Sequence, residues 1–495
     1  MSTNKKPEMD VENFFTQIKE AIGFFKELEG TILCISHIDA DGLTSAGIIG
    51  RALHREGIQY HIRSVRQLEL PIISELSTMK GVDNIIFTDL GAGQLEGINK
   101  YLKERNIIIL DHHPPVVEPA SENIINVTPF DSDIDGAYQI SGAGVAYFFA
   151  KELNKKNIDS APLAVVGALA DRQDKGEKSN LVGLNRQIVQ DGIKTDLLEE
   201  RLDIRLFGRE TRPIHQSLEY TTDPFIPGLS GNADMCHRFL RDTNIPRKKG
   251  EEWRTIQDLT KKERAMLVDA LITYGLSHGM SVEETQSILG EVYVLTKEHP
   301  KTFLRDAREF GSLLNSCGRL GATGIAIGIC MGERQFLYDK AQEILSEYRL
   351  KIAKALELVQ EESDRLKEYS NIIVFDGREG LIDDTMIGTI ISIVISSQPF
   401  NEKNKPLLGM AESDDGTTKI SARGTGELVA EGLDLGEALR EAASSIGSNS
   451  EGGGHNIAAG ARVPQGTEQL FLEKVNSVIE EQFTRKDKTT MEGDK

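Results

Sequence analysis

Carboxylate and imidazole side chains recur just after apolar runs in the first third of the chain. Four clusters occur in this way: Asp39 and Asp41 after TILCIS, Asp89 after NIIFT, Asp111, His112 and His113 after NIIIL, and Asp171 after APLAVVGALA. Side chains of these types at this density would repel and desolvate one another unless cations neutralised them. Mixed oxygen and nitrogen donors suit Mn²⁺ or Mg²⁺, and two such ions bridged by a carboxylate activate water for displacement at phosphorus. The pattern therefore predicts a metal-dependent phosphoesterase site.

The elements that position these residues are expected to be parallel strands alternating with helices. The runs at 31–36, 84–88 and 106–110 are continuously apolar, which is typical of strands buried on both faces, and a helical candidate lies at 44–55. Because ligands bind at the carboxyl edge of open parallel sheets, folding should gather the four clusters in one crevice.

Taken singly, these residues have simpler interpretations. Asp39 or Asp41 could cap the helix that follows, since Asp is a good N-cap residue. Asp111 could orient a histidine without touching a metal. Capping does not explain a pair of histidines directly after an aspartate at a strand end, so the whole set favours a metal site.

The same residues resemble the motifs of the DHH phosphoesterases. Asp111-His112-His113 matches the signature, Asp39-Ala40-Asp41-Gly42 resembles motif I, Asp89 motif II and Asp171 motif IV. The turn at 452–455 (GGGH), followed by AAGA, is similar to the signature of the accompanying DHHA1 domain. Within the family, SHIDADGLTSAG and the stretch 206–231 are similar to archaeal RecJ-like exonucleases, a group that includes the GINS-associated nuclease.

The resemblance implies a role for each motif residue. The implied metal ligands are Asp39, Asp41, Asp89, His112 and Asp171, and the implied catalytic residues are Asp41, Asp89, His112 and His113. Asp89 would bridge two ions, and His113 would contact the scissile phosphate. Asp111 would contact these residues without binding a metal itself. One departure is that the bacterial RecJ pattern extends as HxDxDxDG, whereas this chain has Ile35 four residues before Asp39. His37 either substitutes as a ligand or only lines the site.

A second set of residues is expected to bind substrate phosphate. Consecutive glycines let backbone N–H groups approach an anion closely, so Gly453 and Gly454 are candidates, and His455 adds a donor beside them. Arg423, at the end of the run KISAR, is placed to fork onto a phosphate. The alternatives are an ordinary mobile glycine loop and a surface arginine.

The predicted class is α/β, with a parallel-sheet DHH domain, a smaller α/β DHHA1 domain, a mainly helical insert and a long connecting helix. The expected boundaries are 1–200 for the DHH domain, 201–345 for the insert, 346–370 for the connecting helix, 371–484 for the DHHA1 domain and 485–495 for a disordered tail. In the insert, Arg205, Arg209 and Arg212 are interpreted as surface charge or as a wall of the substrate channel. Trp253 is expected to be a partly buried packing residue, with a partner contact as the alternative.

Composition narrows the class of protein. The 495-residue chain has 57 Lys plus Arg against 77 Asp plus Glu, a formal net charge of −20, which excludes a protein that simply coats nucleic acid. Its four cysteines form no CxxC pair, so neither a disulfide scaffold nor a structural zinc site is indicated. The start of the chain lacks the apolar segment of a signal peptide, and 387–395 is too short to span a bilayer. We therefore expect a soluble cytoplasmic protein.

The resemblance implies a metal-dependent exonuclease that acts on single-stranded nucleic acid, from the 5′ end of DNA, in replication or repair. It implies two Mn²⁺ or Mg²⁺ ions as cofactors, and single-stranded DNA or RNA, GINS and replicative helicase components as partners. A first alternative is a small-molecule or oligonucleotide phosphoesterase of the same superfamily, against which the insert and the long helix argue. A second is a non-catalytic replisome scaffold, which would have lost the metal ligands that this chain retains.

Overall fold

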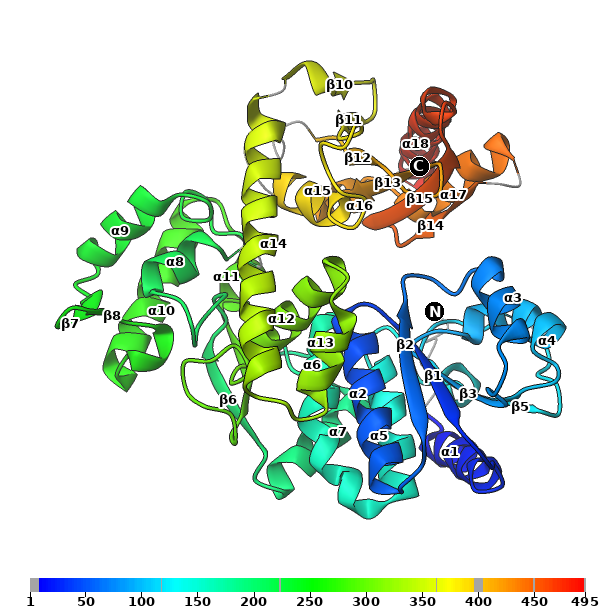
Figure 1. Ribbon diagram of the computed structural model, residues 1–495. Coiled ribbons are helices and arrows are strands. Elements are labelled where there is room, and N and C mark those ends of the chain that lie inside the picture. Colours follow the sequence, from blue (N-terminus) through cyan, green and yellow to red (C-terminus); the bar gives the residue numbers. More distant parts are fainter. Residues whose placement is uncertain are drawn as a thin grey trace. The chain divides into compact units, whose positions relative to one another are not determined.

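Figure 1 shows the computed structural model, which describes residues 9–116, 118–221, 224–361, 363–395, 404–447 and 450–493. The chain divides into two compact units, residues 1–345 and 346–495. Each unit contains a sheet covered by helices and has apolar clusters of its own. The predicted α/β class, with a parallel-sheet domain and a smaller α/β domain, is confirmed.

The first unit is built on a five-stranded parallel sheet. Its strands are β1 Ile32–His37, β2 Tyr60–Val65, β3 Asn84–Thr88, β4 Asn106–Leu110 and β5 Ile124–Val127. They lie in the order β2-β1-β3-β4-β5, and every neighbouring pair is parallel. The direction of winding reverses between β1 and β3, and ligands bind in the crevice outside the carboxyl ends of the strands at such a reversal.

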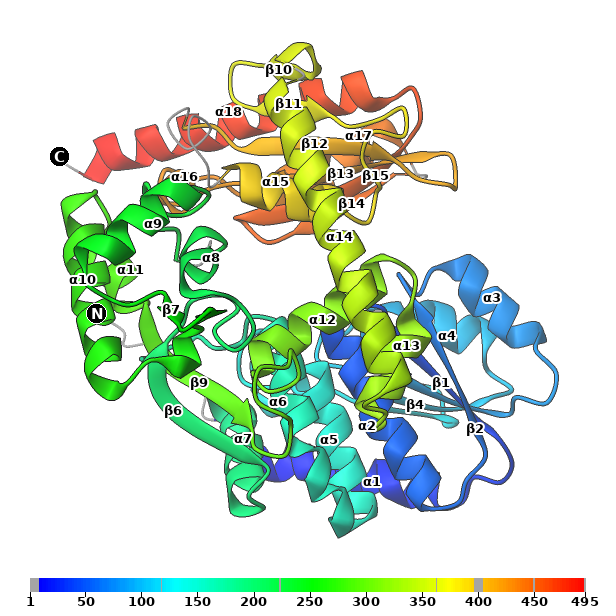
Figure 2. The ribbon, with the colours of Figure 1, turned by 60° about the vertical axis from the view of Figure 1, so that its left-hand side comes forward.

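Helices cover both faces of this sheet. They are α1 Val11–Phe25, α2 Ala40–Arg55, α3 Leu70–Thr78, α4 Leu95–Tyr101, α5 Gly142–Leu153, α6 Ala161–Ala170 and α7 Gly183–Lys194. On one face, Leu33 and Ile35 of β1 pack with α3 and α4, and on the other face Ile32 and Cys34 pack with α1, α2 and α5 (Figure 2). This alternation follows the two-residue period of a strand, so continuously apolar strands bury both faces.

An insert follows the parallel sheet within the same unit. Its elements are β6 Leu198–Ile204, α8 Ile214–Glu219, α9 Ala233–Asp242, β7 Lys248–Lys249, β8 Glu252–Trp253, α10 Lys261–Ser277, α11 Val282–Gln286 and β9 Leu289–Leu295. β6 and β9 pair antiparallel, and the residues between them form a separate apolar cluster over 204–288. After β9, helices α12 Ala307–Arg319 and α13 Thr323–Cys330 rejoin the first core. The separate core is therefore shorter than the insert of 201–345 that we expected.

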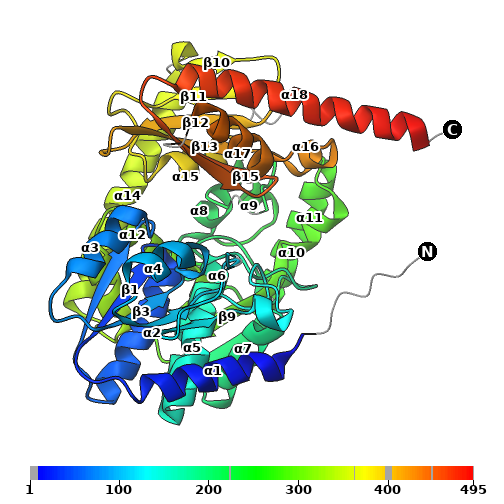
Figure 3. The ribbon, with the colours of Figure 1, turned by 90° about the vertical axis from the view of Figure 1, so that its right-hand side faces the viewer.

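The second unit is a six-stranded mixed sheet. Its strands are β10 Leu366–Glu368, β11 Ile373–Asp376, β12 Leu407–Glu412, β13 Thr417–Arg423, β14 Glu451–Gly454 and β15 Ala458–Pro464, in the order β10-β11-β12-β13-β15-β14. Its helices are α14 Phe336–Glu361, which begins in the first unit, α15 Ile387–Ile395, α16 Gly426–Ala430, α17 Leu435–Ile446 and α18 Glu468–Gly493. α14 and α15 pack on one face of the sheet, and α17 and α18 pack on the other (Figure 3).

Two expectations about helix ends differ from the structure. The connecting helix, expected over 346–370, is α14, which ends at Glu361 because residues 366–368 pair with β11 instead. The tail 485–495, expected to be disordered, continues α18 as far as Gly493, and residues 494–495 lie outside the described part. Arg, Lys and Met favour helix, and no Pro interrupts the segment, so it extends a helix that packing has already started.

All four cysteines are buried and free. Burial raises the pKa of each thiol to about 12.

None of the helices in the described part of the chain has the length and apolar character that a bilayer-spanning segment needs.

Candidate metal centre

The loop after β1 places two carboxylates at the carboxyl edge of the parallel sheet. Asp39 is the N-cap of α2, and its Oδ1 accepts a hydrogen bond of 3.0 Å from Gly42 N. A side chain at Gly42 would lie 2.5 Å from the carbonyl oxygen of His37, so the tight loop requires glycine. Asp39 is thus both a cap and a member of the cluster, and the two interpretations of the sequence do not exclude each other.

Asp41 is buried and held by the first turn of α5. Its Oδ2 accepts from Gly142 N at 2.7 Å, and its Oδ1 accepts from Ala143 N at 3.1 Å. Ser141 caps this helix, whose N-terminal N–H groups favour a negative charge. A Cβ at Gly167 of α6 would lie 2.3 Å from Asp41 Oδ1, so small residues on two helices make room for the carboxylate.

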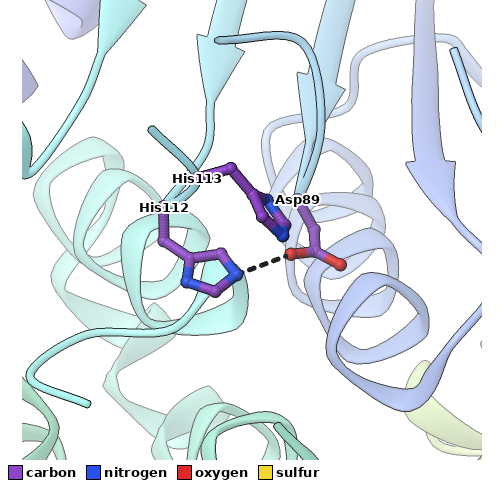
Figure 4. A group of neighbouring side chains, drawn as sticks. All are labelled: Asp89, His112 and His113. Atoms are coloured by element: carbon purple, nitrogen blue, oxygen red, sulfur yellow. Dashed lines mark ion pairs between the residues drawn. The ribbon is translucent and has the colours of Figure 1, made fainter. Parts of the chain in front are cut away.

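Asp89 lies between two groups of donor atoms. It follows β3 with a left-handed backbone, φ 59°, and is 3% exposed. Its Oδ1 is 3.2 Å from His112 Nε2, whereas its Oδ2 is 3.8 Å from His37 Nδ1. Among the described residues, Oδ1 has no hydrogen-bond donor. Figure 4 shows this carboxylate facing the two histidines that follow β4.

The two histidines after β4 have different environments. His112 is buried, and its Nδ1 lies 2.6 Å from the carbonyl of Gly136, which accepts the proton and leaves Nε2 toward the carboxylates. The side chain of His113 is 54% exposed, and its Nδ1 lies 2.8 Å from Asp111 Oδ1. Asp111 is buried and also accepts from Ala92 N at 3.0 Å, so it fixes the orientation of His113.

The fourth cluster contributes Asp171 at the end of α6. Asp171 Oδ2 is 3.9 Å from His112 Nε2 and accepts a 2.8 Å hydrogen bond from Gln173. Gln173 also donates to the carbonyl of Gly136 at 2.8 Å, and its own oxygen accepts from Asn185 at 2.7 Å. One glutamine therefore holds both a carboxylate and the carbonyl that orients His112.

The predicted ligands meet in one place. Three groups have donor atoms that all lie within 4.8 Å of one another: Asp89, His112 and His113; His37, Asp39 and Asp89; and Asp41, His112 and Asp171. Asp89 and His112 each belong to two groups. His37 is part of one of them, with its Nδ1 2.9 Å from Asp39 Oδ2.

The pKa values of the carboxyl groups show that the cluster lacks positive charge. Burial raises the pKa of Asp89 well above its ordinary value, and the neighbouring carboxylates of Asp41 and Asp39 raise it further. Burial also raises the pKa of Asp41, and it raises the pKa of Asp171 to about 6 against the attraction of His112. Because ionising these neighbours together is unfavourable, the donor set fits a bound cation.

His37 and His113 supply part of the positive charge that the carboxylate cluster lacks. Burial acts to lower the pKa of His37, but the carboxylates of Asp39 and Asp89 outweigh it and raise the pKa to about 9. For His113, the hydrogen bond and charge of Asp111 outweigh burial in the same way, and the pKa is again about 9. Both imidazoles are therefore cationic at neutral pH in the metal-free chain.

Several residues that hold the site were not singled out from the sequence. Ser141 and Gly142 position Asp41, Gln173 positions Asp171, and Asn315 Oδ1 of α12 accepts from Ala40 N at 2.9 Å. The run SGAG, with a capping serine before small residues, is a signal that could have indicated the first of these contacts. Asn315 lies far away in the sequence and carries no such signal.

The predicted phosphate-binding residues lie together at one end of the second sheet. Arg423 ends β13 opposite Ala458, and His455 is exposed in the turn between β14 and β15. A Cβ at Gly453 would meet nothing within 4 Å, whereas Gly454 has φ 140° and packs against Ala459. Open backbone at Gly453 leaves space for a ligand to approach. Arg423 is held by Ser392, which accepts from its Nε at 2.7 Å.

Two of the three arginines in the insert are enclosed, so for them both interpretations are wrong. Arg209 is 2% exposed and pairs with Asp203 and, at 3.4 Å, with Asp306. The Arg205 side chain is 7% exposed and lies 2.9 Å from Asp174. Arg212 packs its guanidinium over the Tyr220 ring at 4.4 Å. Arg205 and Arg209 are neither surface charge nor a channel wall, because Asp174 and Asp306, both distant in sequence, help to enclose them, whereas Arg212 is half-buried.

Three sequence models match the chain. They are the DHH family N-terminal domain over residues 31–170, the DHH-CID domain over 206–289 and the DHHA1 domain over 380–481. An uncharacterized protein of Methanocaldococcus jannaschii is 33% identical over 481 residues, which cover 96% of this chain and 99% of that protein.

Two solved structures share the fold. RecJ from Thermus thermophilus, in complex with Mn²⁺, matches with a TM-score of 0.57 at 17% identity, covering 96% of this chain and 56% of RecJ. This chain therefore spans little more than half the length of that RecJ. CDC45 from Entamoeba histolytica matches with a TM-score of 0.61 at 12% identity, covering 94% of this chain and 99% of CDC45. At these identities the likeness concerns the fold.

Proposed function

The chain belongs to the DHH family of phosphoesterases, and from this premise we propose that it is a metal-dependent exonuclease acting on single-stranded nucleic acid. We further propose that its substrate is DNA, degraded from the 5′ end during replication or repair. The fold that it shares with RecJ supports this choice of reaction.

The position of Asp89 is the observation that carries the proposal. One of its oxygens faces His112 at 3.2 Å and the other faces His37 at 3.8 Å, so one carboxylate can serve two neighbouring ions. In this proposal Asp41, His112 and Asp171 would hold one ion, and Asp39, with His37, would hold the other. Bound Mn²⁺ or Mg²⁺ would supply the charge that activates a water molecule and stabilises developing charge on phosphate oxygens. The Thermus RecJ structure contains Mn²⁺.

His113 has the properties of a phosphate-binding residue. Asp111 holds its Nδ1 and, in the metal-free chain, raises its pKa to about 9 against the effect of burial. Its side chain is 54% exposed and can reach a substrate, unlike that of His112. A cationic imidazole donates a charge-assisted hydrogen bond to a phosphate oxygen, which fixes the scissile group beside the carboxylates.

The second unit offers a separate phosphate-binding surface. Its backbone is open at Gly453, Gly454 has a conformation that favours glycine, and His455 is exposed beside them. We assign these three residues, with Arg423, to the backbone of the nucleic-acid strand. Phosphate contacts of this kind position a strand without reading its sequence.

The insert is the part that we assign to protein partners. It has a core of its own over 204–288 and matches the DHH-CID model, and CDC45 shares the overall fold. We propose GINS and the replicative helicase as the partners that dock there.

The test uses one single-stranded DNA labelled at either end and incubated with the intact protein in Mn²⁺, Mg²⁺ or EDTA. Metal-dependent release of nucleotides from the 5′ end is expected, with at least a ~100-fold loss in Asp89→Ala. The matched control is Asp131→Asn, which removes an exposed carboxylate outside the cluster and should keep full activity.

Other outcomes would contradict specific parts of the proposal. Absence of metal-dependent digestion would remove the nuclease assignment and favour a scaffold. Cleavage of dinucleotides but not of long strands would favour a small-molecule phosphoesterase. Degradation of RNA alone, or from the 3′ end alone, would keep the reaction class and overturn the substrate.

A further inference from the structure

A cluster of aromatic rings lies on the insert, on elements that carry none of the metal-centre residues. His215 of α8 and His237 of α9 stack with ring centroids 4.3 Å apart, and Trp253 of β8 lies 4.7 Å from His215. Trp253 is 42% exposed, so part of it packs on His215, as expected of a partly buried residue, and the rest is open to solvent. Figure 1 shows β7 and β8 beside α8, α9 and α10, in the part of the unit formed by the insert.

The strands β7 and β8 form a tight hairpin that presents Trp253. Lys248 pairs with Trp253 and Lys249 with Glu252, and Arg254 N donates to Arg247 O at 2.9 Å. Gly250 in the turn has φ 65°, and a Cβ there would have no neighbour within 4 Å. The hairpin fixes the backbone at Trp253 and leaves the exposed part of the Trp253 side chain accessible.

The imidazole directly beneath Trp253, that of His215, is uncharged at neutral pH. Arg247 Nη1 lies 2.8 Å from His237 Nδ1. Burial, together with the charges of His237 and Arg247, lowers the pKa of His215 to about 4. His215 is buried, and its Nδ1 has no partner among the described residues. A neutral flat ring of this kind is suited to stacking rather than to holding an anion.

The segment that carries two of these rings is rich in cations, in a chain that is otherwise acidic. Over 237–253 there are five Lys and Arg residues against three Asp and Glu, whereas the whole chain has 57 against 77. The five are Arg238, Arg241, Arg247, Lys248 and Lys249. Within the described residues none of them pairs with a carboxylate, and Lys248 Nζ lies over the Trp253 ring at 4.7 Å. Arg254, by contrast, is buried and pairs with Glu263.

We propose that this surface, Trp253 and His237 with the five cations of residues 238–249, is a second binding site for single-stranded nucleic acid. A nucleobase displaces the flexible Lys248 side chain and stacks on Trp253, while the lysines and arginines contact the adjacent phosphates. A single strand is the ligand that presents both flat bases and regularly spaced negative charges, and it complements the rings and the cations together. The inference rests on the proposed function in one respect, that a strand is the substrate.

Trp253 is the only tryptophan in the chain, so its fluorescence reports directly on this site. The intact protein is titrated with an oligothymidylate in excess EDTA, which prevents metal-dependent hydrolysis. Quenching of the Trp253 emission is expected, in step with the anisotropy of a labelled oligonucleotide. Because stacking on one aromatic side chain is worth a large part of single-strand affinity, Trp253→Ala should weaken binding roughly 5- to 100-fold, and Trp253→Phe much less.

A charge-matched pair of variants separates this site from general electrostatics. Lys248→Glu with Lys249→Glu should weaken binding and make it less dependent on salt. Lys261→Glu with Lys262→Glu makes the same change of charge on exposed residues of α10 and should have little effect. Equal losses of oligonucleotide affinity in the two pairs of variants would overturn the proposal. It would also be overturned by unchanged Trp253 emission at a saturating oligonucleotide concentration, or by the absence of oligonucleotide binding.

Failure here is distinguishable from failure of the proposed function. Hydrolysis of a dinucleotide, which is too short to occupy two sites, should be the same in Trp253→Ala as in the unmodified protein. Quenching without any nuclease activity would overturn the exonuclease assignment and leave the binding site standing. Nuclease activity without quenching of the Trp253 emission would overturn the binding site and leave the exonuclease assignment standing.

Discussion

Asp89 combines features that are each unfavourable on their own. Its backbone is left-handed, with φ 59°, although it is not a glycine. Its carboxylate is buried, Oδ1 has no donor among the described residues, and neighbouring carboxylates raise its pKa. Strain and uncompensated charge persist in native proteins mainly where function requires them. The unfavourable free energy at Asp89 therefore supports the proposal that it is the bridging ligand.

The unfavourable burial of the Asp89 carboxylate leads to a prediction about Asp89→Asn. The variant keeps the size of the side chain and removes its charge, so in EDTA it should melt at a higher temperature than the unmodified protein, by a few degrees. Mn²⁺ should raise the melting temperature of the unmodified protein and have a smaller effect on the variant. Calorimetry with and without the ion measures both shifts. A variant less stable in EDTA, or one with an undiminished response to Mn²⁺, would contradict the prediction.

At this scale the sequence indicated the residues that cluster at the sheet edge better than the residues that hold them. Asp89 and His112 could be predicted because each follows a strand, and the topology of a parallel sheet brings strand ends together. Gln173 and Asn315 could not, because their contacts with Asp171 and Ala40 depend on tertiary packing. The buried pairing of Arg209 with Asp306 was missed for the same reason.

At the scale of elements, α12 connects the insert to the metal centre. Asn315 accepts from Ala40 N, next to Asp39, and a Cβ at Gly318 would lie 1.9 Å from the carbonyl oxygen of Ile38. The helix thus packs directly against the loop that carries two predicted ligands. Because the chain reaches α12 only after completing the insert, the loop is supported by a segment distant in sequence.

The first turn of α12 also contains a carboxyl group that opposes folding at high pH. Burial raises the pKa of Glu309 to about 8, with a further contribution from Asp306, although Glu210 N and the Thr211 hydroxyl donate to it. Because the pKa is raised in the folded chain, the contribution of protonated Glu309 to stability is complete below the pKa of the unfolded chain, near 4.5. That contribution is lost as pH rises through 8.

Glu309→Gln should therefore reduce the fall in stability between about pH 5 and 8. At pH 8 the variant is expected to melt above the unmodified protein, by roughly 2–6 °C, because it has no charge to bury. Thermal melts across this range measure the effect. Glu263→Gln is the control of opposite sign, since Arg254 holds the pKa of Glu263 down to about 2, and this variant should lose stability at neutral pH. Parallel pH profiles for Glu309→Gln and the unmodified protein would refute the prediction.

The strands were predictable and the limits of the insert were not. The runs that form β1, β3 and β4 have apolar side chains at successive central positions because both of their faces are buried. The residues after β9 look in sequence like a continuation of the helical insert, but α12 and α13 belong to the first core. Which core a helix joins depends on the partner that its apolar face meets, and that partner is not encoded locally.

At the scale of the whole molecule, α14 contributes to the cores of both units. Tyr338, Ala341 and Leu345 lie in the core of the first unit. Ala355 and Val359 are buried in the second unit, against the face of the sheet that α15 also covers. The expected role of this helix as a connector is therefore incomplete, because its second half is part of the fold of the second unit.

A pair of fragments tests this role. Residues 346–495 retain the second half of α14 and should unfold cooperatively on heating. Residues 366–495 lack it and expose the apolar side chains that Ala355 and Val359 cover, so a broad, non-cooperative melt is expected. Circular dichroism and dye binding distinguish the two. Equal cooperative transitions would show that α14 is only a linker.

The burial of Cys34, Cys236, Cys317 and Cys330 has a practical consequence for labelling the protein. With each thiol pKa at about 12, the thiols are protonated at pH 7, whereas the thiolate is the nucleophile that attacks alkylating reagents. The native cysteines should remain unreactive toward maleimides while the protein is folded, without being replaced. A single cysteine introduced at an exposed position of either unit can then carry a fluorophore or a spin label on the otherwise native chain.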